Sequence, residues 1–395
     1  MFSFNKITAL FLISLLSVSA VLGTEASKAI NASVNRPGFL FLGDMVKSAP
    51  NENAVVSPFS IACAMGMVRN GARGESASGL EQLFGSVIGC GESLRDAMKT
   101  VGDGGKVQVA LSNRLWHAPQ QKVTDAYRKS LQDYFGAFVK DLDFGNAVQA
   151  AAAVNQAVAE DTRGLIKELV KPDTFNAGTA MVLVNTLYFK GGWMVPFAED
   201  MTHDAAFTNA DGSQVPCKMM FAARPVPMIQ DAELGVSGLV LPYKNDAYQL
   251  VALLPEQGRS TAVILDALAG GKLNYWLERT SDFYEIRMFL PKLTVEGKSS
   301  LRKAMEARGA GALFSSRADL SGISGDRSMK LDDVLHAVKL EMNERMTEAA
   351  AATAAIAMRM SLRESKEFRF DRPFVLVLVE RRTGAALFAA VINKM

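Results

Sequence analysis

The sequence predicts a single α+β domain, and three observations support this prediction. Helical patterns gather in the first half of the chain and strand patterns in the second half, which is typical of α+β folds with antiparallel or mixed sheets. The 395 residues are 49% hydrophobic and 21% charged, as in ordinary globular proteins. No internal repeat, long run of charge or flexible linker divides the chain, so we expect one large domain over residues 24–395.

Residues 1–23 have the build of a secretory signal peptide. One lysine precedes an apolar run that ends in small residues, so cleavage is expected after Ala20 or Gly23. The run falls short of the roughly 20 residues of a transmembrane helix, which disfavours a membrane anchor. We therefore expect a secreted, extracellular protein, in which the sequon that begins at Asn31 is a candidate glycosylation site.

The elements of the first half are mainly helices. Ser57 and the proline after it supply a cap and a first-turn residue for a helix over 57–74, which ends at glycines. Further helices are predicted over 124–135 and 146–162. Strand patterns cover 106–117 and 179–193.

The second half consists mostly of strands. They are predicted over 234–243, 248–256, 282–297 and 335–344, with a pair of strands over 373–392. Helices are predicted over 260–280 and 300–310. An alanine-rich segment, residues 343–365, lies between two strand patterns near the C-terminus.

Cysteine content and charge narrow the function classes. With only Cys63, Cys90 and Cys217, we expect the core and not a disulfide framework to supply stability, and Cys63 to be packed in an apolar helix. The net charge of +2 comes from basic residues scattered among acidic ones. This pattern indicates neither nucleic-acid nor membrane binding, and no basic cluster marks a heparin site.

No arrangement of residues indicates an enzyme. His117, His203 and His336 have no Cys or His partner at zinc-ligand spacing, so no metal site is expected. A G-x-S-x-G nucleophile motif is absent, and the Gly-Lys pairs lack P-loop spacing. We expect no catalytic residues and no cofactor.

Four motifs follow one another in a specific order: SPFSIACAMGM (57–67), VNTLYFKGGW (184–193), ADLSGIS with LHAVKLEMNE (318–344), and FRFDRPFVLVL (368–378). Together they resemble the serpin family, over almost the whole mature chain. The resemblance implies the serpin fold of three β-sheets and eight or nine helices, with an exposed reactive centre loop at about 344–366. It also implies a monomer.

The resemblance implies a serine protease inhibitor, with cysteine proteases as a further target class. The target cleaves the loop and forms an acyl-enzyme, and the cut loop inserts into a sheet as a new strand. Two other interpretations remain. A non-inhibitory carrier or chaperone is favoured by Met346 at the usual hinge glycine, and a hydrolase lacks a nucleophile–base pair.

The alanine-rich segment suits insertion as a strand, in which alternate side chains point to opposite faces. One face would carry only small, uncharged residues: Thr347, Ala349, Ala351, Thr353, Ala355 and Ala357. The predicted hinge comprises Glu344, Met346, Thr347, Glu348, Ala349, Ala350, Ala351 and Ala352. Helix propensity alone favours an alanine-rich helix instead.

The family's spacing places the scissile residue thirteen positions beyond Thr347, which gives the bond Met360–Ser361. An unbranched apolar side chain suits the pockets of chymotrypsin-, elastase- or subtilisin-like proteases. The alternative is Arg359, which would suit a trypsin-like pocket.

Family position assigns a role in sheet opening to five residues: Ser57, Ser60, Asn185, Trp193 and His336. Four of them would form a polar cluster, because a buried histidine with hydroxyl and amide neighbours can hydrogen-bond across strands that later part. A core histidine with satisfied hydrogen bonds and a core tryptophan are the simpler interpretations of His336 and Trp193.

Overall fold

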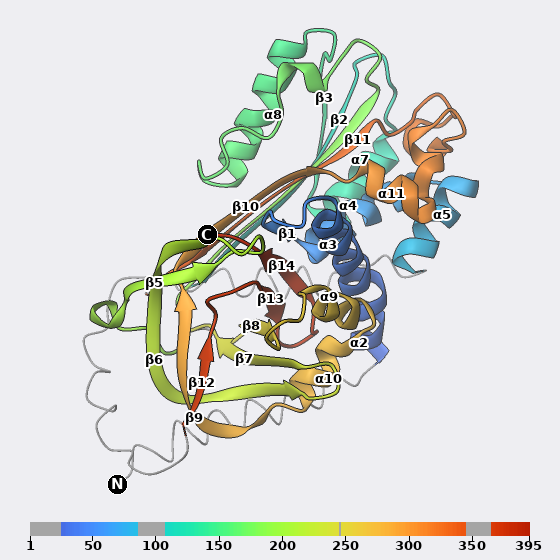
Figure 1. Cartoon of the computed structure of the whole chain (residues 1–395). Coiled ribbons are helices and arrows are strands. Elements are labelled where there is room, and N and C mark those ends of the chain that lie inside the picture. The colour runs from blue at the N-terminus through green and yellow to red at the C-terminus, as the bar shows by residue number, and fades with distance from the viewer. Residues whose placement is uncertain (1–24, 86–106, 245, 345–364) are drawn as a thin grey trace.

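The structure, a computed structural model, describes residues 25–85, 107–244, 246–344 and 365–395 (Figure 1). The described helices are α2 (Glu25–Ile30), η1 (Asn31–Asn35), α3 (Arg36–Ser48), α4 (Pro58–Gly71), α5 (Gly74–Phe84), α7 (Asp125–Phe135), α8 (Ala147–Asp161), η3 (Pro172–Thr174), η4 (Glu199–Met201), α9 (Ala262–Ala269), α10 (Lys272–Glu278), α11 (Arg302–Met305), η5 (Glu306–Ala310), η6 (Gly311–Phe314) and α12 (Ser321–Ser324). The strands are β1 (Ala54–Val56), β2 (Val107–His117), β3 (Phe138–Asp141), β4 (Met181–Gly191), β5 (His203–Thr208), β6 (Gln214–Asp231), β7 (Val236–Pro242), β8 (Tyr248–Pro255), β9 (Ser281–Pro291), β10 (Leu293–Ser300), β11 (Asp333–Met342), β12 (Lys366–Arg369), β13 (Phe374–Glu380) and β14 (Ala386–Ile392).

The first sheet has five strands in the order β10-β11-β4-β2-β3. Strand β11 is antiparallel to β10 but parallel to β4, with which it pairs from Asp333 opposite Val182 to Leu340 opposite Phe189. Strand β2 is antiparallel to β4 on the other side. The middle of this sheet is therefore a parallel pair, which we call the β4–β11 seam.

The second sheet follows the order β1-β14-β13-β8-β7-β6-β9-β12, and β5 pairs with β6 outside this path. The 18-residue strand β6 pairs with β9 between Met219 and Met228 and with β7 near its C-terminal end. Figure 1 shows β6 curving as it passes between these partners. The three predicted sheets are thus the five-stranded sheet and two leaves of the second sheet, β1-β14-β13-β8-β7 and β9-β12, which β6 joins. The α+β prediction is confirmed.

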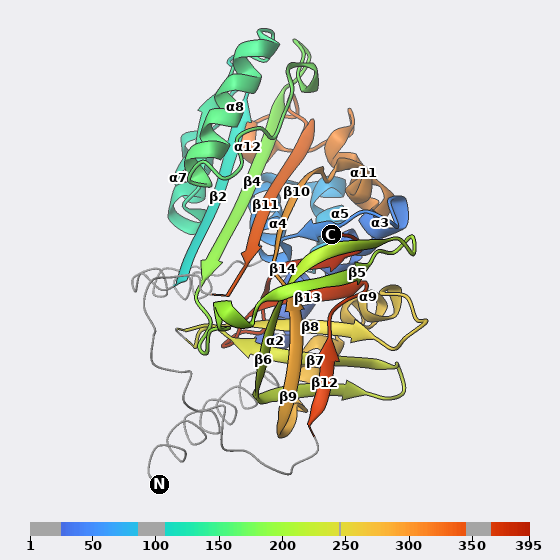
Figure 2. The same ribbon diagram turned by 60° about the vertical axis from the view of Figure 1, so that its left-hand side comes forward.

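Both faces of the seam are buried. On one face, α8 packs on apolar residues of both strands, among them Val184 of β4 and Leu335 of β11. On the other face, Leu183 and Val334 belong to a larger core with α3, α4 and α5. Figure 2 shows α8 on one side of the sheet and these three helices on the other.

Two predicted elements are each divided in the structure. The helix predicted over 260–280 is α9 and α10, which separate at Gly270 and Gly271. Gly271 has a φ of +89°, a left-handed conformation that glycine adopts without steric cost. The strand predicted over 282–297 is β9 and β10, which meet at Lys292 and belong to different sheets.

The structure revises the expectation for Cys63 and describes the surroundings of Asn31. Cys63 of α4 is disulfide-bonded and not merely packed, whereas Cys217 is free and buried; Cys90 lies outside the described residues. Asn31 lies in η1 with its side-chain oxygen buried, and the buried Ser33 hydroxyl donates to the backbone oxygen of Ala29 at 2.6 Å. Asn31 as a whole is half-buried, and its use as a glycosylation site stays a prediction.

The predicted signal peptide, residues 1–23, lies outside the described residues. Within the part of the chain that the structure describes, no helix has the length and apolar character to cross a bilayer.

Candidate functional site

The candidate site is the β4–β11 seam together with the segment that follows β11. Strand β11 ends at Met342, and the chain continues through Asn343 and Glu344 into the predicted reactive loop. A segment that reversed direction there and entered the seam would run antiparallel to both strands, because β4 and β11 are parallel to each other. The topology thus allows one additional strand once the hydrogen bonds of the seam are exchanged.

A buried polar cluster crosses the middle of the seam. Asn185 of β4 and His336 of β11 are register partners, and 2.8 Å separates Asn185 Oδ1 from His336 Nδ1. The Asn185 amide donates to the backbone oxygen of Ser60 at 2.9 Å, and the Ser60 hydroxyl donates to Asn185 Oδ1. The backbone N–H of Ser57 donates to His336 Nε2 at 2.9 Å. The cluster therefore ties the start of α4 to both strands of the seam.

These contacts determine the protonation state of His336. A backbone N–H can only donate, so Nε2, which faces the N–H of Ser57, carries no proton. Nδ1 then carries the ring hydrogen and donates to Asn185 Oδ1. Burial lowers the pKa of His336 to about 3. A second ring proton would point at the Ser57 N–H, so the neutral ring is the form that holds the seam closed.

The structure brings together four of the five residues predicted to control sheet opening. Ser57, Ser60, Asn185 and His336 are all buried and hydrogen-bonded within one cluster. Asn113 of β2, which sequence analysis missed, completes it, because Asn113 Oδ1 accepts from Asn185 Nδ2 at 2.6 Å. An asparagine in the middle of a predicted strand was the available signal, since a buried amide needs partners.

Glu344 anchors the chain just beyond β11. Its carboxylate accepts from the Thr202 hydroxyl at 2.9 Å and lies 3.0 Å from Lys292 Nζ, while its backbone oxygen accepts from the N–H of Phe197 at 3.3 Å. Burial alone would raise the pKa of Glu344, but hydrogen bonds from its own backbone, Lys292 and Thr202 bring the pKa below its usual value. The carboxylate is therefore ionised, and the base of the predicted loop is held in place.

Trp193 lies at this loop base and not in the polar cluster. Its indole N–H donates to the backbone oxygen of Asn343 at 2.8 Å, and its ring stacks on Tyr243 with centroids 4.7 Å apart. A Cβ at the nearby Gly191 would lie 2.7 Å from the Tyr243 ring, so the packing requires glycine there. Trp193 is thus a core aromatic residue and also a contact of the loop base.

The segment that follows α8 is bonded to β11 across the covered face of the sheet. Lys339 Nζ of β11 donates to the backbone oxygen of Leu165 at 3.2 Å. The helix itself is held on β2 by two bonds of 2.7 Å between the Arg114 guanidinium and the Asp161 carboxylate. A new strand in the seam would have to displace α8 and the segment that follows it. The Lys339 contact therefore opposes opening of the seam.

The remaining predicted site residues lie outside the described residues, and their assignments stay predictions. They are the scissile bond Met360–Ser361, its alternative Arg359, and the hinge residues Met346, Thr347, Glu348, Ala349, Ala350, Ala351 and Ala352. Among the residues that the structure does describe, no group of three or more His, Cys, Asp or Glu is arranged to hold a metal ion.

Comparison with known proteins gives consistent matches. Residues 32–395 match the family model described as Serpin (serine protease inhibitor). The chain is 30% identical to Iripin-3 of Ixodes ricinus over 96% of this chain and 98% of that protein. It is 33% identical to leukocyte elastase inhibitor A of Mus musculus over 87% of this chain and 93% of that protein. The fold is similar to that of uncleaved ovalbumin, with a TM-score of 0.83 and 26% identity over 93% of this chain and 100% of that chain.

The buried neutral His336 predicts a specific pH dependence of stability. The unfolded chain takes up a proton on this histidine near pH 6.5, whereas the folded protein does so only near pH 3. The unfolded state therefore binds more protons between these values, and the free energy of unfolding falls as the pH decreases through this window, by up to about 1.4 kcal/mol per pH unit. We expect His336→Gln to lose this component, measured as a shallower fall in urea-unfolding free energy from pH 6.5 to pH 4.

The control is His203→Gln, which removes an exposed histidine. It should keep the pH dependence of the unsubstituted protein. Equal slopes for His336→Gln and the unsubstituted protein would show that His336 is not buried in its neutral form.

A second prediction concerns the loop base. Glu344→Gln removes the charge that Lys292 and Thr202 hold, and we expect it to lower the free energy of unfolding by about 1 kcal/mol or more, because a buried charge-assisted contact is lost. Glu341→Gln, three residues earlier on β11, loses the same charge without an ion pair among the described residues and should have little effect. Urea unfolding measures both. If the two variants are equally stable, Glu344 is not an anchor.

Proposed function

Because the chain belongs to the serpin family, we propose that it is a secreted inhibitor that traps serine proteases as an irreversible suicide substrate. Members of this family are protease inhibitors and not catalysts. We further propose chymotrypsin-, elastase- or subtilisin-like enzymes as targets. The elastase inhibitors among the relatives and the apolar side chain of Met360 support this target class. A trypsin-like target, reached through Arg359, is the alternative.

One observation carries the proposed mechanism: β4 and β11 are directly paired in parallel, and the predicted loop begins where β11 ends. Cleavage at Met360–Ser361 would release the segment from Thr347 onward from its C-terminal anchor. That segment would then fold back into the seam and pair with both strands. Its face of small residues would enter the packed sheet without the overpacking that large side chains cause.

The energy of insertion is large enough to deform a protease. Insertion of about a dozen residues, each with two ladder bonds worth 0.5–1.5 kcal/mol net, gives on the order of 10–30 kcal/mol gross, before the lost β4–β11 ladder and the entropic costs are subtracted. A displacement of catalytic groups by about 1 Å already lowers a rate roughly 100-fold. The acyl-enzyme would therefore persist because the bound protease could no longer hydrolyse it.

Secretion is proposed on two grounds. Residues 1–23 have the pattern of a signal peptide. Cys63 is disulfide-bonded, and disulfides persist mainly in oxidising compartments outside the cytosol. Expression of the full chain in secretory cells, followed by N-terminal sequencing of protein from the medium, tests this point; retention of the whole product inside the cell would contradict it.

Incubation of the purified protein with chymotrypsin, elastase, subtilisin and trypsin tests the inhibitory mechanism. We expect an SDS-resistant covalent complex with one of the first three enzymes, and a released C-terminal peptide that begins at Ser361. A peptide that begins at Met360 would assign cleavage to Arg359. Cleavage without a complex would indicate the non-inhibitory alternative that Met346 favours.

A matched pair of variants tests insertion itself. Thr347→Arg places a long charged side chain on the face that enters the sheet, so we expect cleavage to continue while complex formation falls at least about tenfold, as overpacking costs about 1–3 kcal/mol. Glu348→Arg places the same side chain on the opposite face and should still form complexes. Equal complex yields from the two variants would contradict the assignment of faces.

Lys339 supplies a further prediction. Lys339→Met removes the bond between β11 and the segment after α8, so we expect faster entry of a synthetic peptide of residues 347–357, by about twofold to tenfold for a hydrogen bond worth 0.5–1.5 kcal/mol. Native electrophoresis follows the peptide complex over time. Lys190→Met, on β4, is the control, since Lys190 has no bond across the seam among the described residues. Unchanged uptake by Lys339→Met would exclude the proposed restraint.

A further inference from the structure

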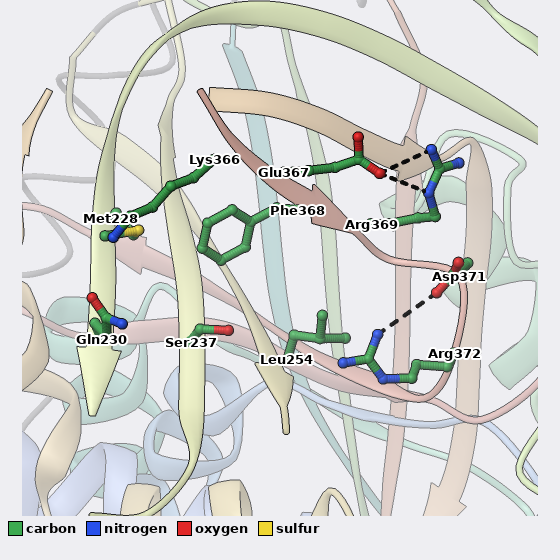
Figure 3. A pocket seen from close by; sticks show the side chains of 10 residues that line it. All are labelled: Met228, Gln230, Ser237, Leu254, Lys366, Glu367, Phe368, Arg369, Asp371 and Arg372. Atoms are coloured by element: carbon green, nitrogen blue, oxygen red, sulfur yellow. Dashed lines mark hydrogen bonds and ion pairs between the residues drawn. The ribbon is translucent and has the colours of Figure 1, made fainter. Parts of the chain in front are cut away.

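A cavity of about 600 Å³ lies between β12 and the leaf formed by β6, β7 and β8 (Figure 3). Gln230 of β6 pairs with Ser237 of β7, which pairs with Leu254 of β8. Directly paired residues project from the same face of a sheet, so these three side chains form one row along a cavity wall. The volume is in the range of small-molecule sites, about 300–1,000 Å³.

The base of the cavity is apolar. Met228, Leu254 and Phe368 line it, and they are 2%, 5% and 7% exposed. Figure 3 shows the Phe368 ring, which comes from β12, beside the Lys366 side chain and among Met228, Ser237 and Leu254. Such a base offers contact to a hydrocarbon chain or ring.

One buried hydrogen-bond donor of the lining belongs to Arg372. This residue donates through Nη2 to the backbone oxygen of Pro255 at 3.0 Å, and its Nη1 lies 3.7 Å from Asp371 Oδ1. Its Nε–H, however, is buried and has no hydrogen-bond partner among the residues that the structure describes. A buried donor without an acceptor is unfavourable, so a ligand oxygen would satisfy this N–H. The exposed Gln230 and the half-buried Ser237 are further polar side chains of the lining.

The charge of the lining favours an anion. Three basic residues, Lys366, Arg369 and Arg372, line the cavity with two acidic ones, Glu367 and Asp371. Glu367 accepts from Arg369 at 3.1 and 3.3 Å, so these two charges pair with each other and leave Lys366 and Arg372 with one acidic residue, Asp371. In Figure 3, the Arg372 guanidinium points toward the side on which Leu254 lies. The basic group is thus placed next to the apolar base.

We propose that this cavity binds a small amphipathic carboxylic acid. The carboxylate accepts hydrogen bonds from Arg372, and the apolar part lies on Met228, Leu254 and Phe368. A neutral ligand would leave the charge of Arg372 without a counter-ion beyond Asp371, and a cation would meet a lining with net positive charge. This binding activity is separate from protease inhibition, and the proposal does not depend on the proposed inhibitory function.

Isothermal titration of the full mature protein with octanoate and with 1-octanol tests the proposal. Both probes carry the same chain, but only octanoate carries the anion. We expect one octanoate to bind per chain, and the affinity for octanol to be lower by a factor of at least about ten. This factor is typical of losing one charge-assisted hydrogen bond. Octanoate should also raise the melting temperature, by an amount that increases with the logarithm of its free concentration above the Kd.

Three variants locate the site. Ser237→Phe and Gln230→Phe fill the cavity from two different strands and should each abolish octanoate binding; Gln230 is exposed, so its variant keeps the test valid if Ser237→Phe does not fold. Arg372→Gln should remove the preference for octanoate over octanol. Arg317→Gln, at an arginine with 67% of its side chain exposed, loses the same charge elsewhere and should bind as the unsubstituted protein does. No octanoate binding, or binding that survives both cavity-filling variants, would overturn the proposal.

Discussion

The parallel hydrogen bonding of β4 to β11 is the constraint on which the rest of the structure depends. Each part of the candidate site joins these strands, covers them or anchors the chain that follows β11. Asn185 and His336 are hydrogen-bonded across the seam. Lys339 bonds β11 to the segment that follows α8, and Glu344 anchors the chain where β11 ends. A parallel ladder is slightly less stable per residue than an antiparallel one. Replacing one parallel pairing by two antiparallel pairings is therefore favourable, but every contact of the seam must open first.

Hydrogen bonding around the seam is uneven. The His336 cluster is well satisfied, because each ring nitrogen has a partner of the right kind. Close by, the hydroxyls of Thr186 and Ser299 are buried and find no hydrogen-bond partner within the described part of the chain, although Thr186 follows Asn185 on β4 and Ser299 pairs with His336 from β10. Buried hydroxyls without partners are uncommon in native proteins and are one way in which a fold stores strain. The hydrogen bonds of the His336 cluster thus hold the seam closed. The hydroxyls of Thr186 and Ser299 are polar groups that could gain partners in a rearranged sheet.

Sequence predicted the strands and the polar cluster better than the tertiary anchors. Period-two patterns and caps placed α4, α7 and β11 within a few residues of their observed ends, because local chemistry decides these elements. Family motifs identified Asn185 and His336. The contacts of Glu344 with Thr202 and Lys292 were missed, since nothing in the sequence shows which distant segments meet. The strand predicted over 282–297 was not divided at Lys292, because both halves have strand character and only tertiary pairing assigns them to different sheets.

The two anchors that flank the predicted loop differ in kind, and this difference matters for the order of events. At the N-terminal side, Glu344 is held by an ion pair and by the backbone of Phe197. At the C-terminal side, β12 is held by four residues paired in parallel with β9 and by the burial of Phe368. In an intact chain, a loop that entered the seam would pull on both anchors at once. Under the proposed mechanism, a cut at Met360–Ser361 would separate the inserting segment from β12, so only the Glu344 contacts and the seam would then oppose insertion. Cleavage would therefore remove one of two restraints, and the contacts of the seam would still have to open.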